Sequence, residues 1–122
     1  MATQPSRTLA DEGFGFRMES LTSVHWLLAV LAIITGAVHV YLYTLDGMVP
    51  FLLAGVIFFA AVVAMALNVF RRLLYAIGIL FVTGQVVLWI LAGTPHFTIG
   101  VLDKVVQVAM LVVLGYLLYT GE

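Results

Sequence analysis

The stretch FLLAGVIFFAAVVAMALNVFRRLLYAIGILFVTGQVVLWILA, residues 51–92, decides the fold of this chain. It is about twice as long as the roughly 20 apolar residues that cross a bilayer as one helix. Its only charged side chains are the neighbouring Arg71 and Arg72. Two arginines are too costly to hold at the middle of a membrane, so the chain must return to the surface there. The stretch therefore predicts two spanning helices with a break at residues 68–72.

The composition of the whole chain supports a membrane location. Of its 122 residues, 64% are hydrophobic and only 9% are charged, with a mean hydropathy of +1.19. Soluble domains carry about 25% charged residues, so lipid must cover much of this surface. The net charge of −1 argues against a nucleic-acid partner. The chain has no cysteine, which excludes disulfides, thiolate metal sites and cysteine nucleophiles.

Two more apolar stretches flank the central one, and the fold class that we predict is all-α, a transmembrane up-down four-helix bundle. Turn-forming residues separate the stretches: Asp46-Gly47 before Pro50, and Gly93-Thr94-Pro95 before Gly100. The alternative has three spans and a re-entrant piece. The four spans are expected over about residues 21–45, 50–70, 73–92 and 101–119.

The ends of the chain are expected in the cytoplasm. Residues 1–20 form a predicted cytoplasmic tail ahead of a membrane domain at 21–122. The acidic Asp11 and Glu12 are unlike a cleaved signal peptide. Cytoplasmic loops carry more Lys and Arg, and four spans place all but one of these residues on the side of the termini. That side holds Arg7, Arg17, Arg71 and Arg72, and the other holds Lys104.

Polar side chains within the spans are the candidate functional residues, because such groups are costly in a membrane. His39, Gln85 and Gln107 lie on three different spans, each roughly 10 Å from the outer boundary at about 1.5 Å per residue. Asp103 and Lys104, with His96, are placed to cap this layer. One interpretation is an outward-facing pocket for a polar ligand, a lipid or quinone head group, or a partner. The other is that these groups hydrogen-bond to each other and lock the bundle.

His25 and His39 form a second pattern. They are 14 residues apart, which corresponds to roughly 21 Å along a helix and to within about 40° of one face. Membrane b-type cytochromes hold two haems at such a spacing, between two pairs of histidines. The spans contain no other histidine, so haem b ligation would need a homodimer. The alternative is that His25, beside Trp26, simply lies at the membrane interface.

Small residues occur in pairs at helical spacing within the spans. Ala32 and Gly36 form one such pair, and Ala60 and Ala64 form another. Gly78 and Gly84 add further positions without a side chain in the third span. Such positions allow close approach of helix backbones in lipid, although small residues are also common in spans generally.

Several segments of the chain form a recognisable set. They are residues 23–26 (SVHW), 36–42 (GAVHVYL), 50–55 (PFLLAG), 71–76 (RRLLYA) with Gly78, and 103–107 (DKVVQ). Together they resemble a group of small uncharacterised four-span membrane proteins of haloarchaea, and the resemblance covers residues 21–118. It implies an archaeal plasma membrane and four spans, and it implies no activity.

The function that we expect is non-catalytic. No catalytic motif, metal-ligand motif or carboxylate inside a span is recognised. Small multidrug transporters are similar in size, but they have a coupling glutamate in their first span that this chain lacks. We predict an accessory or stabilising subunit of a membrane complex, or a homo-oligomer, in contact with lipid and without a cofactor. The alternatives are a small transporter or channel component using His39, Gln85 and Gln107, and a dimeric haem or quinone carrier using His25 and His39.

Overall fold

The computed structural model describes residues 21–122 and consists of four α-helices. All four are long and apolar enough to cross a membrane, which confirms the predicted all-α four-span bundle. The predicted tail at 1–20, with Arg7 and Arg17, lies outside the described residues. The helices are α1 Ser23–Asp46, α2 Val49–Ala66, α3 Arg71–Leu91 and α4 Phe97–Thr120.

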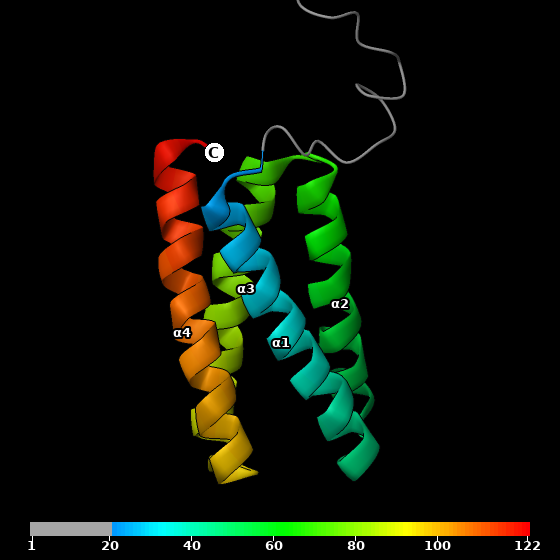
Figure 1. Ribbon diagram of the computed structural model, residues 1–122. Helices are drawn as coiled ribbons and strands as arrows, with labels where there is room; N and C mark the ends of the chain where they lie inside the picture. The colour runs from blue at the N-terminus through cyan, green and yellow to red at the C-terminus, as the bar shows by residue number, and fades with distance from the viewer. Residues whose placement is uncertain (1–20) are drawn as a thin grey trace, which may run out of the picture.

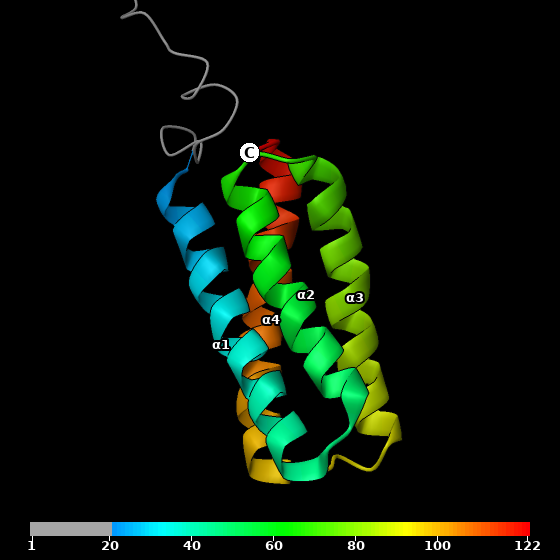
Figure 2. The same ribbon diagram turned by 90° about the vertical axis from the view of Figure 1, so that its right-hand side faces the viewer.

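Consecutive helices run antiparallel (Figures 1 and 2). The start of α1, the α2–α3 turn and the C-terminus lie at one end, here called the terminal end, and the other two connections lie at the loop end. α1 packs against α2 and α4, and α4 packs against α3, whereas α2 and α3 make few contacts with each other. The α2–α3 seam is therefore the least closed side of the bundle.

The predicted break at the arginine pair is confirmed, and the structure adds a role for both arginines. Asn68 and Phe70 adopt the left-handed conformation in the turn, and α3 begins at Arg71. The Arg71 Nε donates to the backbone carbonyl of Met65 at 2.9 Å, and the Arg72 Nη1 donates to that of Leu118 at 3.3 Å. The arginines thus cap the carboxyl ends of α2 and α4, where carbonyl groups lack helical partners and cations are favoured.

The fourth helix begins at Phe97, four residues before its predicted start, so Gly100 lies inside the helix. The indole of Trp89 lies against this glycine: a Cβ there would come within 2.5 Å of the Trp89 Nε1. Gly100 therefore serves the packing of α3 on α4. The earlier start also puts Asp103 in the second turn of a spanning helix, which corrects the expectation that no carboxylate lies within a span.

The predicted close approach at Ala32 and Gly36 is present between α1 and α2. Both residues are buried. A Cβ added at Gly55 of α2 would lie 2.7 Å from the Val40 Cγ2 and 2.9 Å from the Gly36 carbonyl oxygen, so the two backbones meet directly. The apolar core beneath this contact includes Leu28, Phe58, Val82 and Leu117.

Candidate functional site

A buried hydrogen-bond network joins α1, α3 and α4 in the half of the bundle nearer the loop end. The Thr35 hydroxyl of α1 donates to the Asp103 Oδ1 of α4 at 2.6 Å. The Gln107 Nε2 donates both to the Thr35 Oγ1, at 3.2 Å, and to the Gln85 Oε1 of α3, at 2.6 Å. Thr35 and Gln107 are fully buried and Asp103 is 2% exposed. Three helices are therefore connected through polar side chains in an otherwise apolar interior.

The negative charge of Asp103 is balanced locally. Its Oδ2 accepts from the Lys104 Nζ at 2.8 Å. That ammonium also lies 5.8 Å from the centre of the Trp89 ring, within cation–π range. The Trp89 Nε1 donates to the Pro95 carbonyl at 3.0 Å, which ties the indole to the α3–α4 connection. Both carboxylate oxygens of Asp103 are thus engaged, one in the network and one in an ion pair.

The structure separates His39 from the two glutamines of the predicted layer. Its Nδ1 lies 2.7 Å from the Thr35 carbonyl oxygen, one turn earlier in α1. A carbonyl can only accept, so the Nδ1 carries the hydrogen. The ring faces α2, with its centre 6.3 Å from that of Phe51 and 5.6 Å from that of Phe58. The geometry joins Gln85 to Gln107 and directs His39 to a different interface.

His96, the third predicted cap, belongs to another contact. Its Nε2 pairs with the Asp46 Oδ2 at 2.8 Å and ties the two connections of the loop end together. The network instead contains Thr35, which the sequence analysis did not single out. The available signal was its position four residues before His39, on the same helical face. A threonine within a span is not by itself a sign of a polar site, because its hydroxyl can donate to a backbone carbonyl of its own helix.

One acceptor in the network has no partner among the described residues. It is the Oε1 of Gln107, which is buried. Its amide nitrogen already donates twice, so the side chain is fixed from one side. The four side chains bond mainly to each other, and these bonds link α1, α3 and α4.

His25 has a structural role that uses both ring nitrogens. The Nδ1 accepts from the Thr22 backbone N–H at 3.0 Å in a capping box at the start of α1. The Nε2 therefore carries the hydrogen and donates to the Glu122 backbone carbonyl at 3.0 Å. A haem iron needs an available nitrogen lone pair, so the predicted haem pair of His25 and His39 loses one ligand. Within residues 21–122, no group of three or more His, Cys, Asp or Glu side chains is placed to hold a metal ion.

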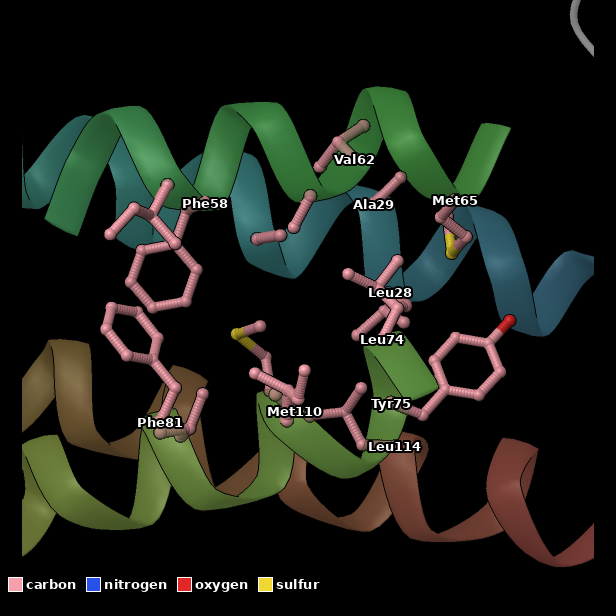
Figure 3. Close-up of a pocket in the computed structure, with 16 residues that line it drawn as sticks. Leu28, Ala29, Phe58, Val62, Met65, Leu74, Tyr75, Phe81, Met110 and Leu114 are labelled. Carbon is pink, nitrogen blue, oxygen red and sulfur yellow. The ribbon is translucent and has the colours of Figure 1, made fainter. Parts of the chain in front are cut away.

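An apolar cavity of about 270 Å³ lies on the other half of the bundle, behind the α2–α3 seam. All four helices line it (Figure 3). Phe58 and Phe81 face each other at one end, with ring centres 5.4 Å apart, and Tyr75 lies at the end nearer the α2–α3 turn. The sequence does not predict this cavity, because two apolar helices have the same residue pattern whether or not they pack closely together.

Comparison with known proteins does not assign the chain to a group. No protein-family model, curated protein or solved structure matches it. The chain is a multi-pass membrane protein with four candidate spans packed as a bundle.

Proposed function

We propose that this protein is a non-catalytic membrane subunit that binds another spanning helix, of a partner or of a second copy, through the outer face of α3. The proposal rests on the exposure of that helix. Only 11% of the residues in the most apolar stretch of α3 are buried, compared with 39% in α1. A bundle that leaves one helix so poorly covered has the largest apolar area there for a neighbour.

The observation that carries the proposal is Gly84, on this outer face. A Cβ at Gly84 would meet no atom within 4 Å, so packing within the bundle does not require a glycine there. Leu80, 74% exposed, and Leu88 lie one turn before and after it on the same face. A glycine between large apolar side chains allows the close backbone approach that drives helix association in lipid.

The polar network supports a non-catalytic role. Gln107 is fully buried and bonded to Thr35 and Gln85, and Asp103 is paired with Lys104. A transport route would need these groups around an open chamber, whereas their mutual bonds favour a locking role. The remaining features of the proposal are the archaeal plasma membrane, from the resemblance, and a cytoplasmic terminal end, from the positions of Arg71 and Arg72.

Single cysteines test the proposal cleanly because the chain has none of its own. Gly84→Cys and Leu88→Cys place a thiol on the outer face of α3, and Val112→Cys places one on the exposed face of α4 as a matched control. In native membranes, a benzophenone maleimide attached to these thiols should, on irradiation, cross-link the α3 variants to one discrete product, and mass spectrometry should identify a partner or a dimer. Uncross-linked monomer in all three variants, or equal products from all three, would refute the proposal.

The same approach tests the sidedness. A membrane-impermeant maleimide applied to intact cells should label Gly93→Cys, at the loop end, and spare Thr120→Cys, at the terminal end. The reverse pattern would place the termini outside.

A further inference from the structure

We propose that the α2–α3 seam binds one anionic membrane lipid, with a hydrocarbon chain in the apolar cavity and a phosphate head group at Arg71 and Tyr75. This site is on the seam and does not depend on the outer face of α3 or on any protein partner. It is distinct from the Thr35–Asp103–Gln107–Gln85 network, which lies nearer the loop end.

The size of the cavity suits one hydrocarbon chain of a lipid and is too small for a helix. Its volume of about 270 Å³ equals roughly nine times the 30 Å³ that a water molecule occupies in the liquid. A helix with side chains is about 10 Å wide and cannot enter such a space. From Met65 to Phe58 the cavity follows α2 for seven residues, or roughly 10 Å. Ile57 and Ile77 line it and are also half-exposed, so the cavity opens sideways toward lipid between α2 and α3.

Two buried donors without partners among residues 21–122 lie on α3 near one end of this cavity: Tyr75 lines it, and Arg71 lies outside its lining. The hydroxyl of Tyr75, a residue 1% exposed, and the Nη2 of Arg71, a residue 8% exposed, have no hydrogen-bond partner among residues 21–122. They are one helical turn apart on α3. The ring of Tyr75 lines the cavity, and its hydroxyl points past Met65, away from Phe58 and Phe81 (Figure 3). Arg71 is bonded to the carbonyl of the same Met65.

The chemistry of these donors specifies the head group. A guanidinium and a phenol hydroxyl together favour an acceptor that carries negative charge, and arginine binds phosphate well. Basic pockets between spanning helices on the cytoplasmic side are typical sites for anionic lipid head groups. Among the described residues of the terminal end, Arg71 and Arg72 outnumber Glu122, and Arg71 is the cation one turn from Tyr75. An unsatisfied buried donor in a membrane is costly, and a phosphate at this position would satisfy two.

Native mass spectrometry of the full chain in neutral detergent tests the site. Delipidated protein is titrated with dioleoyl phosphatidylglycerol, and separately with dioleoyl phosphatidylcholine, a zwitterionic lipid with the same chains. One phosphatidylglycerol should bind with saturation, and phosphatidylcholine should bind at least about fivefold more weakly, as expected for the loss of net negative charge. Equal binding of both lipids would overturn the proposal.

Two variants test the position of the lipid. Tyr75→Phe removes only a hydroxyl that has no partner within residues 21–122, and should weaken phosphatidylglycerol binding about fivefold or more. Ala61→Phe fills the cavity and should weaken it about tenfold, whereas Ala60→Phe, on the adjacent exposed position of α2, should not. Unchanged binding in both Tyr75→Phe and Ala61→Phe would refute the site.

Two arginine variants distinguish a specific contact with the head group from a general attraction of anionic lipid to the basic end of the bundle. Arg71→Gln should lower affinity for phosphatidylglycerol about fivefold or more, while Arg72→Gln, whose side chain reaches toward Leu118, should leave it nearly unchanged. Equal losses in the two variants would mean attraction to the basic end as a whole and would overturn the assignment to Arg71. If Arg71→Gln does not fold because α2 loses its cap, Tyr75→Phe and Ala61→Phe still decide the matter.

Discussion

The α1–α2 contact and the α2–α3 seam differ although a short connection joins the helices in both cases. α1 and α2 meet through Gly36 and Gly55, and α1 is also bonded to α4 through Thr35. α2 and α3 have no such glycine contact; the bond from Arg71 to the Met65 carbonyl joins them at the turn, and a cavity lies between them farther along. In a membrane, an apolar side chain gains little free energy when it moves from contact with lipid to contact with another helix, because both environments are apolar. Close backbone approach and polar bonds therefore decide which neighbours close, and adjacency in sequence does not.

The largest expected effect comes from breaking the polar network on the closed side. Asp103→Ala leaves the Lys104 ammonium and the Thr35 hydroxyl without their partner. Removing one member of a largely buried ion pair destabilises by several kcal/mol, and we expect a loss of about 3 kcal/mol in the free energy of unfolding. Steric trapping in bicelles measures this quantity.

A second ion pair provides the control for that change. Asp46→Ala removes the Asp46–His96 pair, whose side chains are partly exposed at the loop end. Exposed pairs contribute little, so the expected loss is below about 1 kcal/mol. If the two variants lose the same stability, the buried network has no special part in closing the bundle.

The next effect concerns the glycine contact between α1 and α2. In Gly55→Ala, the added methyl group would lie 2.7 Å from the Val40 Cγ2 and 2.9 Å from the Gly36 carbonyl oxygen. The backbone oxygen cannot move without shifting α1, so we expect a loss of about 2 kcal/mol by the same measurement. Gly84→Ala, which meets nothing within 4 Å, should be neutral or slightly stabilising. A neutral Gly55→Ala would show that the helices are free to separate there.

Sequence reasoning predicted those parts of the fold that follow from the transfer of residues between water and lipid. The four spans and the return of the chain at Arg71 are of this kind, because each depends on the local cost of an apolar or charged side chain. Depth along a helix is also local, since it follows from the rise per residue. Depth placed Gln85 and Gln107 in one layer, and the bond between them agrees with one of the two interpretations of that layer.

The directions in which His39 and Thr35 point were not predicted, because they depend on how each helix is rotated about its axis. His39 has the depth of the glutamines but faces Phe58 of α2, and Thr35 faces Asp103 in its place. Packing of the bundle sets this rotation, and segments that are apolar all round give no amphipathic pattern from which to read it. The start of α4 was placed late because Gly100 was placed ahead of the fourth span, whereas it lies inside α4 and its lack of a side chain makes room for Trp89.

The smallest expected effect concerns Tyr75, at the loosely packed α2–α3 seam. Tyr75→Phe, in delipidated protein, removes a buried hydroxyl that has no partner among the described residues. Removal of an unsatisfied polar atom relieves its desolvation cost while the ring keeps its contacts, so stability should rise, by up to about 1 kcal/mol. In bilayers that contain phosphatidylglycerol the sign should reverse, because the lipid then satisfies the hydroxyl and stabilises the folded state by mass action. A loss of stability in both conditions would mean that Tyr75 bonds within the protein, and that the α2–α3 seam is closed by the chain itself and not by lipid.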